Sequence, residues 1–385
     1  MSVDAVRAVA DAVLYEGYLL YPYRASAQKN RSRWQFGVVM PDGYGDGSEP
    51  SYTRAECLME GGTAVTVVLR FLQVQRRTDA LSTWDEAVPC EISLTAQDFP
   101  HEHAFTVPGG EEGPRRRLPL SGVVTVSAQA LPGPWGARRL RVRVDNRTPL
   151  PGPGERDSAL PAALVAAHTV LQVAGGAFVS MVDPPEWAAD AVAGCVNVGT
   201  WPVLAGPPGA RDLMLCAPII LYDHPQVAPE SPGDLFDGAE IDEILTLRTL
   251  ALTDEEKREA RLTDPRAADL IDRTEHLTPE QLLGLHGTVR SMRRMSTVDG
   301  DSVLVDGRRI AAGSRVRLRP GTRRADAQDM FLTGRLAVVE AVLTDVDDRP
   351  YLAVTLADDP GADVQRDHGR FRYFGPDEVE PCDGP

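Results

Sequence analysis

The chain has 385 residues, of which 43% are hydrophobic and 25% are charged, and its formal net charge is −16 at pH 7. This composition is ordinary for a folded protein, and the length predicts two or three domains with real hydrophobic cores. The negative charge repels nucleic acid and anionic membranes, and no apolar run approaches the ~18 residues that a membrane span needs. General nucleic-acid binding and membrane insertion are therefore excluded.

The start of the chain and the cysteines indicate the compartment. The first residues include Asp4, Asp11 and Glu16 instead of the basic and apolar regions of a secretory signal. Five cysteines are an odd number, and no two of them form a CxxC pair, which argues against a disulfide framework and against a zinc ribbon. We therefore expect a cytoplasmic protein whose thiols are free.

Residues 1–235 are expected to form a strand-rich α+β domain. Apolar residues at helical spacing predict a short amphipathic helix over 3–14. The apolar segment 159–181 is expected to be a helix that packs against the sheet. Three strands are predicted from runs of apolar and β-branched residues, the last of which alternates with arginines: 63–75, 123–131 and 138–146.

Beyond this domain the pattern changes twice. Capping boxes at Thr253 to Glu256 and at Thr278 to Gln281 mark helix starts, and three short helices are expected within 240–292. From residue 299 onward, about five short strands separated by turn residues predict a small SH3-like or OB-like β-barrel. The fold class is thus α+β, with three expected parts: an N-terminal domain over 1–235, a helical segment over 236–298 and a barrel over 299–385.

Two segments contain the candidate partner-binding residues. Residues 18–34 place aromatic side chains beside cations, and this combination often anchors protein interfaces. Residues 222–243 form an acidic, proline-rich loop that leads into a helix. The structural alternatives are a core strand with a solvated basic loop, a capped helix start, and ion pairs between the two segments. The candidates are Tyr21, Tyr23, Arg24, Lys29, Arg31, Arg33, Trp34, Asp234, Asp237 and Glu240.

A metal site is the alternative chemistry. Cys195, Cys216 and His224, with Asp223 nearby, would supply soft ligands for nickel, zinc or copper if their segments lie side by side. Their spacing matches no metal signature, and a cysteine in an apolar strand is usually a small hydrophobic residue. No GxxxxGK[ST], GxGxxG, HExxH or GxSxG motif occurs, so the common nucleotide, zincin and hydrolase signatures are absent.

Three long segments of the sequence share a resemblance: LYPYRASAQKNRSRWQFGV, APIILYDHPQVAPESPGDLFDGAEIDEILTLRTLALTDEEKREA, and GSRVRLRP with the later DMFLTGRLAVVEAVLTD and LAVTLADDPG. In these segments the chain resembles an uncharacterised bacterial family whose genes lie beside those of oxygen-tolerant uptake [NiFe] hydrogenases and their maturation factors. The resemblance covers nearly the whole chain. It implies a cytosolic accessory or assembly role, and it supplies no catalytic residues to carry over.

The leading expectation is a non-enzymatic hydrogenase accessory protein. It would dock to a hydrogenase subunit or a maturation factor through protein–protein contacts and would need no cofactor. One alternative is a metal-handling or hydrolytic maturation enzyme that uses the cysteines, the histidine and nearby carboxylates, with nickel or zinc bound in transit. A second alternative is a general cytosolic scaffold protein.

Overall fold

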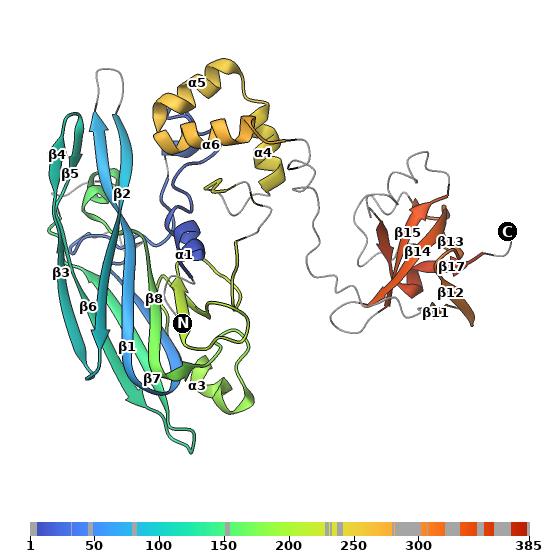
Figure 1. Cartoon of the computed structure of the whole chain (residues 1–385), viewed down its shortest axis with the longest axis horizontal. Coiled ribbons are helices and arrows are strands. Elements are labelled where there is room, and N and C mark those ends of the chain that lie inside the picture. Colours follow the sequence, from blue (N-terminus) through green and yellow to red (C-terminus); the bar gives the residue numbers. More distant parts are fainter. Residues whose placement is uncertain are drawn as a thin grey trace. The chain divides into compact units, whose positions relative to one another are not determined.

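A computed structural model (Figure 1) describes the chain over residues 6–31, 33–44, 49–78, 83–150, 155–227, 231, 233–236, 242–278, 281, 302–305, 307–319, 332–344, 350–357 and 371–382. The chain divides into two compact units, Met1–Thr288 and Val289–Pro385. The helical stretch that follows the strand-rich region therefore belongs to the first unit. Each unit is described by itself.

A single 27-residue strand, β1 (Tyr52–Thr78), organises the first unit. Its first part pairs with β7 (Ala137–Asn146), and its second part pairs with β2 (Thr83–Ala96) on one side and β8 (Val165–Phe178) on the other. Gly61 and Gly62 lie between these parts at φ of 65° and 90°, where the register with β8 shifts. Glycine adopts this backbone conformation without steric cost, so β1 bends here.

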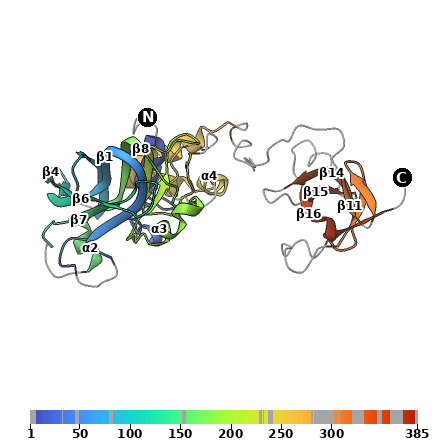
Figure 2. The ribbon, with the colours of Figure 1, turned by 90° about the horizontal axis from the view of Figure 1, so that it is seen from below.

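The resulting antiparallel sheet has ten strands, with the order β3-β6-β7-β1-β8-β10-β9 along its main path. Seen from below in Figure 2, β1 curves and the sheet curls with it. A short hairpin, β4 and β5, pairs with the end of β1. The bounds of the remaining strands are β3 (His101–Val107), β4 (Gly110–Glu112), β5 (Arg115–Arg117), β6 (Leu120–Ala130), β9 (Trp201–Leu204) and β10 (Leu213–Ala217).

The inner face of the sheet holds the main core. Alternate residues of β1, such as Val67, Leu69 and Phe71, are fully buried there because successive side chains of a strand point to opposite faces. The alternation predicted for 138–146 is confirmed in β7, whose inward residues are Leu140, Val142 and Val144.

The prediction of a packing helix over 159–181 is wrong. Only its start is helical, in α2 (Arg156–Ala159) and the 3₁₀ turn η3 (Leu160–Ala162), and β8 then runs through the sheet between β1 and β10. Both faces of β8 are covered: Leu171 faces the main core, whereas Val170 faces the opposite side. A strand buried on both faces is apolar throughout, and its sequence resembles that of a buried helix.

Helices cover the outer face of the sheet. The predicted N-terminal helix is present as α1 (Arg7–Leu14), which buries Ala10 and Val13 against outward residues of β1, β8 and β10. Three short helices lie within 240–292, namely α4 (Asp242–Leu250), α5 (Asp254–Thr263) and α6 (Pro265–Glu275), and they pack in a second cluster with residues 14–40. The helix start predicted at Thr253 is confirmed, whereas α6 starts after Asp264, where no start was predicted. The helix predicted to start at Thr278 would run through 279–292, of which only Gln281 is among the described residues. The remaining short elements are η2 (Gln28–Arg31), η4 (Glu186–Ala188) and α3 (Ala189–Ala193). None of the described helices has the length and apolar character needed to cross a bilayer.

The second unit contains the short strands predicted after residue 299. Five of them form an antiparallel sheet of order β16-β15-β14-β13-β17, and β11 and β12 form a hairpin. Val316, Val339 and Leu352 are fully buried in a core of their own. The bounds are β11 (Ser302–Val305), β12 (Arg308–Ala311), β13 (Arg315–Leu318), β14 (Leu336–Thr344), β15 (Pro350–Leu356), β16 (Arg372–Phe374), η6 (Pro376–Glu378) and β17 (Val379–Pro381).

Candidate functional site

Much of the aromatic and cationic stretch near the N-terminus lies in the core. Tyr23 is fully buried, and Trp34 and Arg33 are 3% and 6% exposed. The guanidinium carbon of Arg33 lies 3.6 Å from the ring centroid of Trp84 and 4.4 Å from that of Trp34. Its nitrogens donate to the backbone oxygens of Tyr18 and Asp85. Burial lowers the pKa of Arg33 to about 10. Because its guanidinium stacks on these rings, Arg33 supports the packing of aromatic side chains inside the first unit.

Asp264 fastens the helices to the sheet beside this cation. Its Oδ2 accepts hydrogen bonds from the Tyr18 hydroxyl at 2.8 Å and from Trp84 Nε1 at 3.4 Å. Its Oδ1 accepts from the backbone N–H of Arg266 at 2.9 Å and so caps the start of α6. Burial, together with the neighbouring Asp264 carboxylate, raises the pKa of Tyr18. Tyr18 and Asp264 thus form a structural joint between β2 of the sheet and the start of α6.

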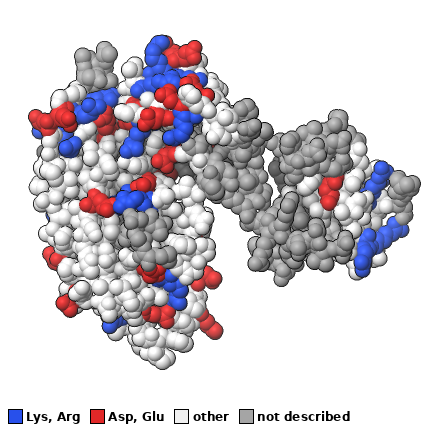
Figure 3. Space-filling view, viewed as in Figure 1, with Lys and Arg blue, Asp and Glu red and all other residues white. Residues whose placement is uncertain are grey.

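The other predicted docking residues are distributed differently. Arg24 pairs with Glu256 at 3.2 Å and with Glu259 at 3.9 Å, so its acidic partners lie on α5. Tyr21 packs edge-on against Tyr23 with 6.0 Å between ring centroids. Figure 3 shows charges of both signs intermixed at this end of the first unit. Of the remaining candidates, Lys29 and Asp234 are exposed, Arg31 ends η2, and Asp237 and Glu240 lie outside the described residues.

The two candidate metal-binding cysteines lie in different surroundings. Cys216 is fully buried in β10, and burial raises the pKa of its thiol to about 12. Cys195 follows α3, is half-buried, and donates from Sγ to the carbonyl oxygen of Ala191 at 3.4 Å. Among the described residues, no group of three or more His, Cys, Asp and Glu side chains is placed to hold a metal ion.

Asp223 and His224 cover the outer edge of β9. Asp223 accepts from the backbone N–H of Leu204 at 2.8 Å and from the Ser180 hydroxyl at 2.5 Å. The backbone N–H of His224 donates to the Leu204 oxygen at 2.7 Å. Pro202, in the same strand, has no N–H to leave unpaired. These residues satisfy the polar groups of an edge strand, which would otherwise invite pairing with another chain.

An apolar groove opens on the surface of the first unit. Its interior volume is about 500 Å³, within the range of ligand-binding sites. Three large apolar residues in it are unusually exposed: Ile220 at 81%, Trp201 at 44% and Phe36 at 40%. Four separate segments line the groove: Gln35 to Val39, Glu49 to Thr53 without Ser51, Gly199 with Trp201, and Pro218 to Ile220.

Close backbone packing shapes the floor of this groove. Gly37 has a φ of 59°, and a Cβ atom there would lie 2.9 Å from both the Pro218 side chain and the backbone nitrogen of Ala167. The same nitrogen donates to the Gly37 oxygen at 2.9 Å. Only glycine permits this approach at this conformation. The groove is therefore a defined feature of the backbone as well as of its side chains.

The charges around the groove are already paired. Glu49, which lines it, accepts two hydrogen bonds of 2.7 Å from Arg156, and this contact raises the pKa of Arg156. Arg143 lies 3.7 Å from the ring centroid of Tyr52 and forms a two-bond pair with Asp145. The groove consequently offers apolar surface without an uncompensated charge at these positions, and such a site suits an uncharged ligand.

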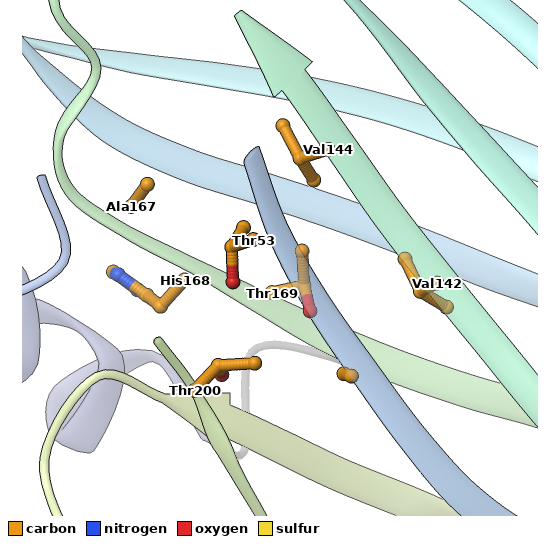
Figure 4. Close-up of a pocket in the computed structure, with 8 residues that line it drawn as sticks. Thr53, Val142, Val144, Ala167, His168, Thr169 and Thr200 are labelled. Atoms are coloured by element: carbon orange, nitrogen blue, oxygen red, sulfur yellow. The ribbon is translucent and has the colours of Figure 1, made fainter. Parts of the chain in front are cut away.

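A small cavity adjoins the groove behind Thr53, which lines both. Its volume of about 10 Å³ has room for about one water molecule. Figure 4 shows Thr53, Thr169 and Thr200 gathered around it, whereas the imidazole of His168 points away. The Thr53 hydroxyl donates to the oxygen of Val198 at 2.9 Å. The cavity is too small for a substrate and belongs to the interior of the sheet.

The sequence offered only a faint signal for the groove. The apolar run that forms β10 continues past the end of the strand through Ile219, Ile220 and Leu221. An apolar run of this kind usually indicates burial, yet Ile220 is 81% exposed. Phe36 and Trp201 carry no local pattern that separates them from core residues.

A comparison with protein-family models finds no match, and a comparison with curated protein sequences finds none either. The geometry of the groove and the pairing of its charges are therefore the observations from which a function can be argued.

Proposed function

We propose that this chain is a non-enzymatic accessory protein and that an uncharged, apolar segment of a partner protein docks in the groove. The observation that carries the proposal is the exposure of Ile220, Trp201 and Phe36 around one concave surface. Large apolar residues that line a concave surface are typical of binding sites, and tryptophan is prominent among residues that dominate binding energy. The paired state of Glu49 and Arg143 favours an uncharged occupant.

The resemblance to a family encoded beside [NiFe] hydrogenases makes a hydrogenase subunit or one of its maturation factors the first partner to test. In this proposal the protein acts in the cytoplasm, binds no nucleic acid and does not insert into membranes. Its second unit is a small SH3-like or OB-like barrel that serves as an adaptor. These statements rest on the sequence resemblance, the composition and the strand pattern.

The test measures binding of the purified full chain to each purified hydrogenase subunit and maturation factor by biolayer interferometry. We expect one of them to bind. We expect Trp201→Ala combined with Ile220→Ser to weaken that binding at least tenfold, because each substitution removes a large apolar contact. The matched control is Leu247→Ser with Leu262→Ser, which removes two apolar residues that are 51% and 73% exposed on α4 and α5.

Two results would contradict the proposal separately. If no hydrogenase component binds, the hydrogenase role is wrong. If a component binds but the groove variant and the control variant weaken binding equally, the groove is not the docking site. Thermal melting of both variants, compared with the unchanged chain, shows whether any loss comes from unfolding.

A further inference from the structure

A second exposed aromatic feature lies apart from the residues that line the groove. Trp135, in the turn between β6 and β7, stacks on Trp187 of η4 with 5.2 Å between ring centroids and 23° between ring planes. Trp187 is anchored because it packs against Leu58 and Val179, which are fully buried. Trp135 remains 54% exposed although one of its faces meets Trp187. The opposite face of this indole is therefore open to solvent.

Acidic side chains accompany this stack. The stretch 181–200 contains Asp183, Glu186 and Asp190 and no lysine or arginine. All three acids are exposed, and within the described part of the chain none of their carboxylates forms an ion pair or a side-chain hydrogen bond. Two cations hold this segment through backbone oxygens: Arg139 donates to that of Ala191 at 3.1 Å, and Arg54 donates to that of Val196 at 3.1 Å. Arg138, three residues after Trp135, is exposed, so three acids and one cation face solvent in this part of the surface.

An open indole face beside uncompensated carboxylates selects a particular kind of ligand. The face of tryptophan attracts cations more strongly than that of any other side chain, and a planar guanidinium can stack on it. Nearby carboxylates strengthen this attraction and repel phosphate groups, which disfavours nucleotides, nucleic acid and anionic lipid. We propose that the Trp135–Trp187 stack is a docking point for an arginine-bearing segment of a partner protein.

This docking point is independent of the groove, because the two surfaces share no residue and bind different kinds of side chain. The groove suits an uncharged apolar segment, whereas the stack suits a cation. A partner that carries both features would be held at two places and gain avidity from their linkage. Either site can be tested while the other is left intact.

The test uses the full chain labelled with ¹⁵N and follows the indole N–H signals, which are assigned with the variants Trp135→Phe and Trp187→Phe. The probe is the capped peptide acetyl-Gly-Arg-Arg-Gly-amide. We expect it to shift the signals of Trp135 and Trp187 in a saturable manner and to leave that of Trp201 unchanged. The equivalent peptide with two lysines is expected to bind more weakly, and those with two glutamines or two glutamates are expected not to bind.

Variants separate local recognition from overall charge. Trp135→Ala is expected to weaken peptide binding about fivefold, the scale of one cation–aromatic contact. The triple variant Asp183→Asn, Glu186→Gln, Asp190→Asn should weaken peptide binding by a similar factor. The remaining binding should also depend less on salt concentration, because fewer charge pairs remain to be screened. Trp201→Ala, which alters only the groove, is expected to leave peptide binding unchanged.

A matched control neutralises three exposed acids elsewhere, namely Asp98→Asn, Glu102→Gln and Glu112→Gln. It changes the net charge of the chain by the same amount and should leave binding intact. Equal weakening in the two triple variants would assign the binding to overall charge and overturn the proposal. The proposal would also be overturned if the glutamine peptide bound as tightly as the arginine peptide, or if the signals of Trp135 and Trp187 did not move.

Discussion

A buried histidine should make the stability of the first unit depend on pH. His168 is 1% exposed in β8, and its Nδ1 lies 2.8 Å from the Ala166 oxygen. Its Nε2 has no hydrogen-bond partner among the described residues. Arg70 of β1 is its register partner and also contacts Asp11 of α1 and Glu91 of β2. Burial is the main cause that lowers the pKa of His168 from 6.5 to about 4, and the charge of Arg70 adds to it.

The direction in which stability changes with pH follows from when His168 binds a proton in the folded and unfolded chains. In the unfolded chain His168 takes up a proton near its ordinary pKa, whereas in the folded chain it stays neutral until about pH 4. The stabilising contribution is therefore complete above pH 6.5 and is lost progressively as the pH falls from 6.5 towards 4. A depression of this size corresponds to a loss of about 3 kcal/mol in full, of which about 2 kcal/mol is lost by pH 5.

Urea unfolding followed by tryptophan fluorescence measures this effect. All five tryptophans of the chain lie in the first unit, so the signal reports that unit alone. Between pH 7.5 and pH 5, the free energy of unfolding should fall by about 2 kcal/mol less in His168→Gln than in the unchanged chain, because glutamine does not titrate. Equal falls in the two proteins would show that His168 is not the group responsible and would refute the reasoning.

Four further predictions concern Asp264, the Arg24 ion pair, the Cys216 thiol and the second unit. Asp264→Ala should lower the free energy of unfolding of the first unit by ~2–3 kcal/mol, because it removes the α6 cap and leaves buried donors unpaired. Arg24→Gln should shift the urea midpoint only slightly, because the ion pair of Arg24 with Glu256 is partly open to solvent and surface ion pairs stabilise little, and a shift as large as that of Asp264→Ala would contradict this. Cys216 should resist iodoacetamide at pH 8 in the native chain, since burial raises the pKa of its thiol to about 12, and rapid native labelling found by mass spectrometry would disprove it. A fragment of residues 289–385 should give dispersed amide signals by NMR, because this unit has its own core, and random-coil dispersion would show that it depends on the rest of the chain.

Short-range patterns were sufficient to predict several elements. The cap of α5 is an example, since the Thr253 hydroxyl accepts from the Glu256 backbone N–H while the Glu256 carboxylate accepts from the Thr253 backbone N–H. The alternation of β7 and the helical spacing of α1 were also readable. In each case the determining contacts lie within a few residues or on one face of one element, so composition and period suffice.

Contacts between distant segments decided the remaining features. Residues 165–178 form a strand because apolar residues of other segments pack on both faces of β8. The spacing of apolar residues within the segment does not distinguish such a strand from a buried helix. Arg33 became a core residue because Trp84, about fifty positions later in the chain, lies under its guanidinium. The groove required four segments spread between residues 35 and 220 to meet around Gly37. Such sites depend on long-range packing and on the backbone path, and neither is encoded in a local sequence pattern.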